Sequence, residues 1–363
     1  MSQLYDKLIR PVLFGMDPES AHELGLETLR LALSSEYAQR AARNRFAVDV
    51  FGDIERFGLK FRNPLGVAAG FDKNGVVVNQ LASLGFGFVE VGTVTHRPQE
   101  GNEKPRMFRL PEDQAIINRL GFNNEGTEAV IDRLKSIDRK CVVGVNIGRN
   151  KDVPNEEAIG NYLESYNAAF DTADYVAVNV SSPNTSGLRE LQKADSLQML
   201  LASLQERNRR LSGDAALKPL FVKIAPDLSD DEVIAITDIC TNLKITGIIA
   251  TNTTVARENL RTSDPDRSRP GGLSGKPLFQ RSNDVISLIY RHSEGQMPVI
   301  GVGGIFNAED AFSKIAAGAC LIQAYTGFIY KGPGFARDVS RELASFLKQM
   351  GFANLDEAIG SAA

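Results

Sequence analysis

The sequence predicts an α/β protein of the (β/α)8 type, a TIM barrel with a small N-terminal helical extension. From about residue 64 onward, short apolar runs alternate with amphipathic, helix-like stretches, and eight such runs can be distinguished. Polar residues gather where nearly every run ends, which is where barrel enzymes build their sites. The chain length of 363 residues suits one large barrel with an appendage. Together these observations favour a barrel of parallel strands.

The expected strands and helices follow one another in a regular order. A doubly wound sheet is the competing arrangement, and it would lead us to expect a G-x-G-x-x-G turn after an early strand. The first such turn instead reads G-V-A-A-G-F-D-K, from Gly66 to Lys73. The expected strands are 65–69, 88–91, 142–147, 175–180, 220–224, 247–250, 299–302 and 321–324. The expected helices are 128–136, 162–170, 195–208, 230–240, 282–290 and 308–316.

The first 50 residues have a different pattern. A helix is expected to begin at Asp17, because Asp is a good N-cap and the proline after it suits the first helical position. An apolar helix with two apolar faces needs two apolar neighbours, which could be the barrel on one side and either a helix over residues 4–14 or lipid on the other. At about 100° per residue, one face carries Leu26, Leu29 and Leu33, and the nearly opposite face carries Leu24 and Leu31.

Charge and composition exclude several function classes. A net charge of -4, with Lys and Arg spread along the chain, argues against nucleic-acid binding. Three cysteines without C-x-x-C spacing and three widely separated histidines predict neither a disulfide framework nor a metal site. Neither a signal peptide nor a run of about 18 apolar residues is present, so we expect a cytosolic or peripheral protein.

The loop N-V-S-S-P-N-T, from Asn179 to Thr185, is the strongest candidate for a catalytic segment. It follows an apolar strand and places hydroxyls, carboxamides and a rigid proline at a surface where hydrogen bonds matter more than packing. We predict Ser182 to be a catalytic base. The competing interpretation is a strand-to-helix turn in which Ser181 or Ser182 caps the next segment.

Glycines after the last two strands predict a phosphate site. Gly303 and Gly304 follow one strand and Tyr325, Thr326 and Gly327 follow the next, which matches the phosphate site of many barrels. Glycine lets backbone N–H groups close on the anion. A phosphate-bearing ligand is therefore expected, and FMN is a common ligand of this kind in such barrels.

Lys223 ends the fifth strand, where its desolvation is costly unless it meets negative charge. A reduced flavin carries such charge at N1, and Lys223 could stabilise it. An ion pair with Asp227 or another carboxylate is the alternative. Lys73 ends the first strand and could hold a carboxylate substrate or a flavin oxygen.

Carboxamides recur at the predicted strand ends. The loop from Asn118 to Asn124 is rich in them, and Asn179, Asn184 and Asn252 stand at other strand ends. Asn offers a donor and an acceptor together, which suits the amide edges of a planar heterocycle. The lining therefore favours a pyrimidine-like ring as the ligand.

Nine motifs, in one order over about residues 53 to 340, resemble those of the quinone-dependent class of dihydroorotate dehydrogenases. In that class a serine stands where the soluble class has cysteine. The resemblance implies a (β/α)8 barrel with an N-terminal helical pair, binding of FMN, and oxidation of dihydroorotate to orotate in pyrimidine synthesis. The motifs are L-G-V-A-A-G-F-D-K-N-G, E-V-G-T-V-T, N-R-L-G-F-N-N, N-I-G-R-N-K-D, N-V-S-S-P-N-T, V-K-I-A-P-D-L-S, A-T-N-T-T, G-G-L-S-G-K-P-L and G-V-G-G-I.

The resemblance also implies site residues. Ser182 would remove the proton from C5 of dihydroorotate while hydride passes from C6 to N5 of FMN, and a hydrogen-bonded relay would carry the proton away. Substrate would be bound by Lys73, Asn118, Arg119, Leu120, Gly121, Phe122, Asn179, Asn184, Asn252 and Thr253. FMN would be bound by Ala69, Gly70, Phe71, Asp72, Lys73, Thr93, Asn146, Asn179, Lys223, Thr251, Gly275, Gly304, Tyr325 and Thr326.

The family passes its electrons to a membrane quinone through a tunnel beside the N-terminal helices, and His22 and Arg109 match tunnel positions. A helix-surface histidine is the competing interpretation of His22. We expect three parts: a membrane- and quinone-associated segment 1–45 and an FMN-binding barrel 46–345, which the resemblance implies, and a C-terminal helix or tail 346–363, which matches no motif. The resemblance further implies a monomer attached peripherally to the cytoplasmic side of the cell membrane.

Two other functions stay open at this point. One is a different FMN barrel, such as a soluble dehydrogenase of the cysteine-base class, against which Ser182 and the helical extension argue. The other is a barrel that binds flavin or phosphate without catalysis. It predicts that Ser182 can be replaced without consequence.

Overall fold

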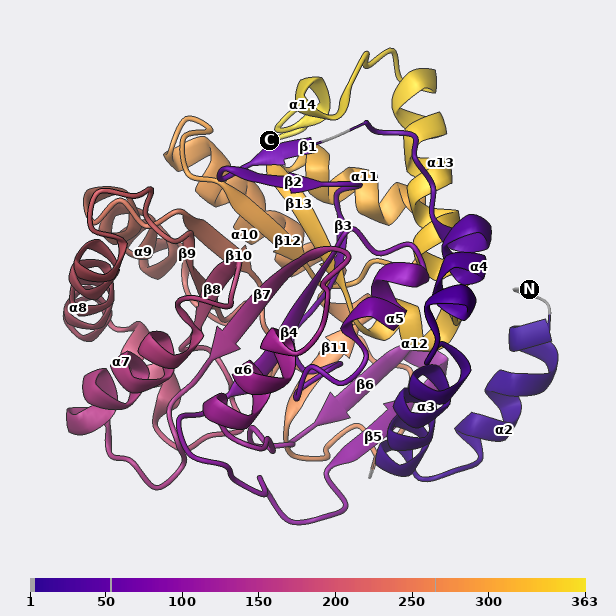
Figure 1. Ribbon diagram of the computed structural model, residues 1–363, viewed down its shortest axis with the longest axis horizontal. Coiled ribbons are helices and arrows are strands. Elements are labelled where there is room, and N and C mark those ends of the chain that lie inside the picture. Colours follow the sequence, from indigo (N-terminus) through magenta and orange to yellow (C-terminus); the bar gives the residue numbers. More distant parts are fainter. Residues whose placement is uncertain (1–3, 53, 265) are drawn as a thin grey trace.

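Eight parallel strands close into a barrel in the computed structural model (Figure 1), which describes residues 4–52, 54–264 and 266–363. Neighbouring strands are consecutive along the chain, and the last barrel strand pairs with the first. The predicted TIM barrel is therefore confirmed. Its strands are β3 (Leu65–Val67), β4 (Phe88–Val94), β7 (Val142–Ile147), β8 (Tyr175–Asn179), β9 (Leu220–Ile224), β10 (Gly247–Ala250), β12 (Val299–Val302) and β13 (Ala319–Ala324).

Helices surround the barrel and cover its outer surface. The barrel strands are buried on both faces, which explains why they are continuous apolar runs rather than alternating ones. The six predicted helices are all present. The surrounding helices are α5 (Val78–Ser83), α6 (Thr127–Lys135), α7 (Ala158–Ala169), α8 (Ala194–Ser212), α9 (Asp230–Asn242), α10 (Phe279–His292), α11 (Ala308–Ala316), α12 (Thr326–Lys331) and α13 (Phe335–Gln349).

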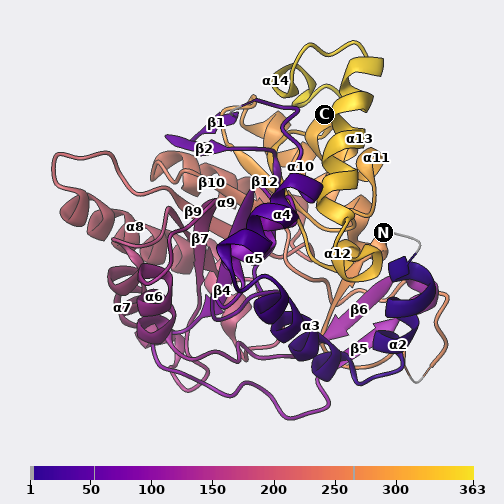
Figure 2. The ribbon, with the colours of Figure 1, turned by 45° about the vertical axis from the view of Figure 1, so that its right-hand side comes forward.

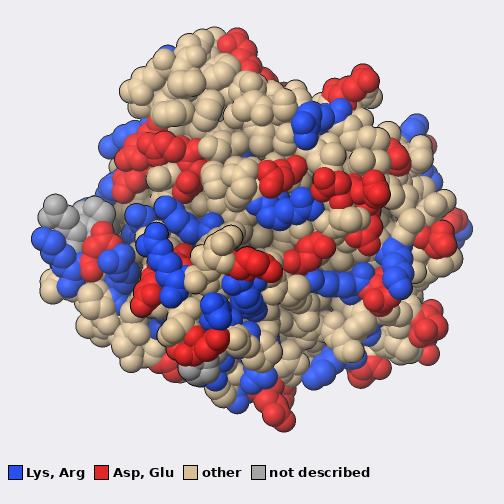
Figure 3. Space-filling model, turned by 180° about the vertical axis from the view of Figure 1, so that it is seen from behind, with Lys and Arg blue, Asp and Glu red and all other residues tan. Residues whose placement is uncertain are grey.

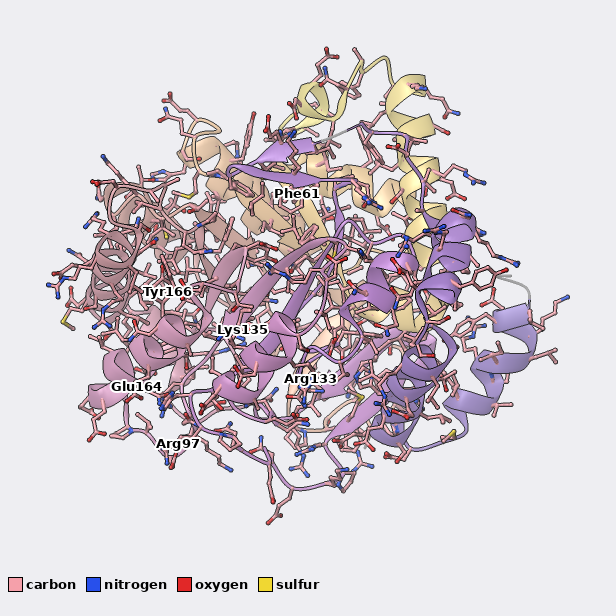
Figure 4. All side chains as sticks on the ribbon, in the orientation of Figure 1. Phe61, Arg97, Arg133, Lys135, Glu164 and Tyr166 are labelled. Carbon is pink, nitrogen blue, oxygen red and sulfur yellow. The ribbon has the colours of Figure 1, made fainter. Side chains whose placement is uncertain are left out.

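A short hairpin covers the N-terminal end of the barrel. It consists of β1 (Ile54–Arg56) and β2 (Leu59–Phe61). Phe61, labelled in Figure 4, packs edge-on against Phe88 with ring centroids 5.3 Å apart. Phe57 packs in the same way against Phe221 at 5.0 Å. Because aromatic rings fill this end, the ligand site must lie at the opposite one.

A second, antiparallel sheet stands beside the other end of the barrel. It contains β5 (Met107–Leu110), β6 (Ala115–Asn118) and β11 (Gly272–Gly275), in the order β11-β6-β5. Its strands come from the long excursions after β4 and β10, and the sequence analysis did not predict them. In Figure 2, β5 and β6 lie next to the N-terminal helices.

The N-terminal extension is helical, as predicted. The segments η1 (Tyr5–Ile9) and α2 (Arg10–Phe14) form one helical stretch, followed by α3 (Pro18–Ala32) and α4 (Glu36–Phe46). Asp17 is the N-cap of α3, because its carboxylate accepts the N–H of Ser20 at 2.9 Å. One predicted face of α3, with Leu26, Leu29 and Leu33, packs against the core, whereas Leu24 and Leu31 on the other are 46% and 62% exposed.

A buried ion pair fastens α3 to the barrel. The Glu19 carboxylate accepts three hydrogen bonds from Arg106, the shortest 2.7 Å, and both side chains are largely shielded from solvent. Arg106 also donates to the carbonyls of Glu100 and Asn102. The Asn102 amide then donates to the carbonyl of Asn184, in the predicted catalytic loop. The extension is thus connected to that loop by a chain of polar contacts.

The C-terminal segment packs along the barrel helices. Helix α13 continues past the domain boundary that was predicted at residue 345. The short helix α14 (Leu355–Ala358) buries Leu355 and Ala358, and the N–H groups of Gly360 and Ala362 donate to carbonyls of α11. On the face shown in Figure 3, Lys and Arg side chains are interspersed with Asp and Glu.

Candidate functional site

A cavity opens at the C-terminal ends of the barrel strands, where polar residues were predicted to gather. Nineteen of the predicted substrate, cofactor and catalytic residues line it. The sequence therefore identified most of one continuous wall. These residues are Lys73, Asn118, Leu120, Gly121, Phe122, Asn179, Ser182, Asn184, Asn252, Thr253, Ala69, Gly70, Thr93, Lys223, Thr251, Gly275, Gly304, Tyr325 and Thr326.

Ser182 lies in this wall and is only 5% exposed. Its Oγ accepts the backbone N–H of Asn184 at 3.2 Å, a local loop contact that leaves the hydroxyl hydrogen free to reach a ligand. Neither serine of the loop caps the following helix, since the N-cap of η4 (Leu188–Gln192) is Gly187. The competing interpretation of this loop as a helix cap is therefore not supported.

The loop is held in place from two sides. Arg189 donates to the carbonyl of Ser181 at 3.0 Å and to that of Thr253 at 3.1 Å. The Asn252 amide donates to Ser181 Oγ at 2.9 Å and to Asn179 Oδ1 at 3.2 Å. These contacts fix the loop against β10, so Ser182 is presented on a rigid support.

The predicted carboxamides converge on the cavity. Asn118, Asn179, Asn184 and Asn252 all line it, although they come from three different segments of the chain. The Asn184 amide donates to Asn118 Oδ1 at 3.3 Å, which ties the second sheet to the catalytic loop. A carboxamide offers a donor and an acceptor together, which suits the amide edges of a heterocycle.

Lys223 has a carboxylate partner that the sequence analysis did not identify. Its Nζ lies 3.7 Å from Oε1 of Glu90, a residue of β4 that is completely buried. Burial lowers the pKa of Lys223, and Glu90 opposes that shift. Asp227, the partner considered from the sequence, instead pairs with Arg189 at 2.9 Å.

Gly303 and Gly304, which follow β12, line the cavity and pack closely against the protein behind them. Gly304 has φ +75°, and a Cβ there would lie 2.5 to 3.0 Å from atoms of Phe279 at the start of α10. Two buried polar atoms in the cavity region, Thr251 Oγ1 and Gln323 Oε1, have no hydrogen-bond partner among the described residues. Buried polar atoms are normally satisfied, so both are available to a polar ligand.

Lys73 lies in the cavity wall and is partly buried. Burial lowers the pKa of Lys73 to about 8, and Arg106 adds to this, whereas Glu19 and Asp72 oppose it. Near neutral pH the side chain is therefore still mostly protonated and can bind an anion.

Four predicted contact residues lie outside the cavity lining, each for a visible reason. Arg119 turns outward and donates to the carbonyl of Pro105. Asp72 accepts the N–H groups of Val76 and Val77 and so organises the loop after β3. Asn146 lies one layer below the wall and accepts the Thr93 hydroxyl at 2.5 Å. The fourth residue, Phe71, lines a different cavity.

That second cavity is apolar and lies between the N-terminal helices and the barrel. It contains both predicted tunnel residues, His22 and Arg109, together with Phe71. Arg109 stacks on the Phe14 ring at 4.7 Å and donates to the carbonyl of Met16. His22 Nε2 lies 2.8 Å from the carbonyl oxygen of Phe71, so its N–H points into the protein. His22 is therefore not the solvent-facing histidine that was the competing interpretation.

Burial lowers the pKa of His22 to about 3, and the nearby Lys73 charge adds to that shift. Between about pH 6.5 and pH 3 the unfolded chain binds a proton at this position and the folded chain does not. The free energy of unfolding should therefore decrease as the pH is lowered through this range. When the pH is lowered from about 7.5 to about 5.5, the free energy of unfolding should decrease in the parent and in a His22→Gln variant. We expect the decrease to be about 1 kcal/mol smaller in the variant, because glutamine does not titrate. Urea denaturation at both pH values measures this. Equal losses in the two proteins would contradict it.

Some residues at the base of the site escaped the sequence analysis. Glu90 and Gln323 lie inside apolar strands and Tyr175 begins one, so they were read as parts of those runs. The usable signal was chemical: a Glu and a Gln in strands that are otherwise apolar need buried partners. Ser274 was also missed, although it lines the cavity and its hydroxyl contacts that of Thr326 at 2.8 Å.

Comparisons with known proteins agree with this geometry. Residues 53–347 match the family model for dihydroorotate dehydrogenase. A dihydroorotate dehydrogenase (quinone) of Christiangramia forsetii is 50% identical over 94% of this chain and 98% of its own, and that of Gloeobacter violaceus is 49% identical over 98% of both. A crystal structure of the enzyme from Eimeria tenella in complex with ferulenol superimposes with a TM-score of 0.85 at 39% identity, covering 96% of this chain and 98% of that one. The chain therefore belongs to the quinone-dependent dihydroorotate dehydrogenase family.

Proposed function

We propose that the protein oxidises dihydroorotate to orotate in pyrimidine biosynthesis, with FMN as cofactor and a membrane quinone as final electron acceptor. The observation that carries the proposal is the convergence of Ser182, Lys73 and four asparagines on one cavity at the C-terminal end of the barrel. The names of the relatives support the same reaction.

FMN is proposed as the cofactor because the cavity offers the groups that it requires. Gly303, Gly304 and Thr326 would hold its phosphate, and Thr251 and Gln323 bring the two unpartnered polar atoms. Lys223 would lie near the polar edge of the ring system. When bound, FMN accepts the hydride that leaves C6 of dihydroorotate and passes the electrons on to the quinone.

Lys73 and the asparagines are proposed to bind the substrate. The Lys73 ammonium would pair with the dihydroorotate carboxylate, and the carboxamides would pair with the two amide edges of its ring. This binding would orient C5 towards the catalytic loop. The walls formed by Leu120 and Phe122 would limit the access of water.

Ser182 is proposed to remove the proton from C5. An isolated serine is a weak base at neutral pH, so its own proton must pass to a relay. Thr185 is a candidate for that relay, because it lies in the same loop and its buried Oγ1 has no partner among the described residues. Buried water between the two hydroxyls would complete the path.

The apolar cavity beside His22 is proposed as the quinone site. It lies under the helices whose outer surface carries the exposed side chains Leu8, Val12 and Leu31. A surface of this kind suits insertion into a lipid interface, and we propose peripheral attachment there. Among the described residues, no helix combines the length and the apolarity needed to cross a membrane.

An anaerobic titration tests the whole proposal. Mixing the FMN-loaded protein with dihydroorotate should bleach the oxidised-flavin absorbance, and a soluble quinone added next should restore it. No bleaching would remove the substrate assignment. Bleaching without recovery would remove the quinone assignment, and failure of the protein to bind FMN would remove the cofactor.

A further inference from the structure

Glu90 lies beneath the cavity at the centre of the barrel, and no step proposed above uses it. It is completely buried, and it is held by donors on every side. Asn146 Nδ2 donates to Oε1 at 2.8 Å, whereas Gln323 Nε2 and the Tyr175 hydroxyl donate to Oε2 at 2.7 and 3.0 Å. The Lys223 ammonium lies 3.7 Å from Oε1.

This arrangement identifies the charge state of Glu90. A protonated carboxylic acid would need an acceptor for its own hydrogen, and its neighbours are all donors. The Tyr175 hydroxyl could serve as an acceptor only by giving up its bond to Glu90; burial and the Glu90 charge raise its pKa, so it remains a protonated donor. Glu90 is therefore an anion, compensated by Lys223 and three neutral donors.

Two of these partners, Lys223 and Gln323, also line the cavity. The negative charge of Glu90 thus lies one side chain away from any ligand bound there. In a buried site charges interact strongly, because little water screens them. Adding electrons to a ligand next to Lys223 is favoured by the lysine and opposed by Glu90.

We propose that Glu90 is a positioning residue that holds Lys223 and lowers the reduction potential of the flavin, which keeps its electrons available to the quinone. The inference rests on the proposed function, since it assumes that FMN occupies the cavity. A neutral side chain at this position would leave the lysine charge uncompensated and would make the reduced flavin more stable.

The test is the flavin midpoint potential, measured by equilibration with reference dyes in the FMN-loaded protein. For Glu90→Gln we expect the ratio of reduced to oxidised flavin at a fixed potential to rise at least tenfold, which equals about 30 mV for a two-electron couple. Glu164→Gln is the matched control, because Glu164 is exposed on α7 at the periphery (Figure 4). A potential equal to that of the parent in Glu90→Gln, with FMN bound, would overturn the inference.

A second pair of variants serves if Glu90→Gln alone does not fold. Lys223→Gln leaves the Glu90 anion unpaired, whereas Lys223→Gln with Glu90→Gln replaces the ion pair by two neutral amides, which buried sites tolerate better. At a fixed potential, the ratio of reduced to oxidised flavin should be at least tenfold higher in the double variant than in Lys223→Gln. Equal midpoint potentials in Lys223→Gln and the double variant, with FMN bound in both, would overturn the inference. A parent protein that binds no FMN, or that dihydroorotate does not reduce, would instead overturn the proposed function.

Discussion

Replacing Ser182 by alanine is expected to lower turnover with dihydroorotate by about 10²-fold or more, at unchanged FMN content. The hydroxyl is the proposed base in the cavity wall, and among the described residues its one hydrogen bond is to the N–H of Asn184, so its removal should not disturb the fold. The loss should appear in the rate of flavin bleaching after anaerobic mixing. Recovery of the bleached flavin by quinone should remain normal, because Ser182 takes no part in that half-reaction.

The matched control for Ser182 is Ser186→Ala, four residues further along the same loop. Ser186 is exposed and does not line the cavity, so this variant should bleach at the rate of the parent. Bleaching of Ser182→Ala at the rate of the parent would refute the assignment of Ser182 as base. The alternative of a barrel that merely binds flavin predicts instead that dihydroorotate bleaches neither the variant nor the parent.

Replacing Gly304 by alanine is expected to weaken FMN binding by about tenfold to 100-fold, the equivalent of about 1 to 3 kcal/mol of overpacking. The added Cβ would lie 2.5 and 2.6 Å from Cβ and Cα of Phe279, and its φ of +75° disfavours any side chain. The loop proposed to receive the phosphate would therefore have to shift. Reconstitution of the FMN-free protein, followed by flavin fluorescence, gives the dissociation constant.

Gly160→Ala is the control for this substitution. Gly160 lies in α7, and a Cβ there would meet no atom within 4 Å, so FMN affinity should be unchanged and the helix slightly more stable. The contrast separates a local steric effect from a general effect of adding a methyl group. An unchanged dissociation constant in Gly304→Ala would argue against this loop as the phosphate site.

The barrel could be predicted because its signals are local. Each barrel strand is a mainly apolar run of three to seven residues, and the start of a helix such as α9 is marked by a capping box, here Ser229 with Glu232. The polar strand ends could be assigned to one site, because parallel barrel strands all end on the same side. The positions of Ser182, Lys223 and Asn252 followed from these two facts.

The second sheet could not be predicted in the same way. Residues of β11 pair with β6, about 155 positions earlier in the chain, and no local pattern in four residues such as G-L-S-G announces a strand. The partner of Lys223 was missed for a related reason, since Glu90 comes from β4 and meets it only when the barrel closes. Arg119 shows the reverse: it stands inside a motif whose neighbours line the cavity, yet its side chain turns away.

The peptide bond between Gly70 and Phe71 lies between the polar cavity at the barrel mouth and the apolar cavity beside the N-terminal helices. Gly70 borders the polar cavity and Phe71 the apolar one, so in the proposed mechanism dihydroorotate and quinone would occupy separate cavities. Neither reactant would then have to leave before the other binds. A small apolar inhibitor lodged against His22 and Arg109 would consequently depress kcat for dihydroorotate without raising its KM, and selectivity among related enzymes could be sought in that cavity without any resemblance to the pyrimidine.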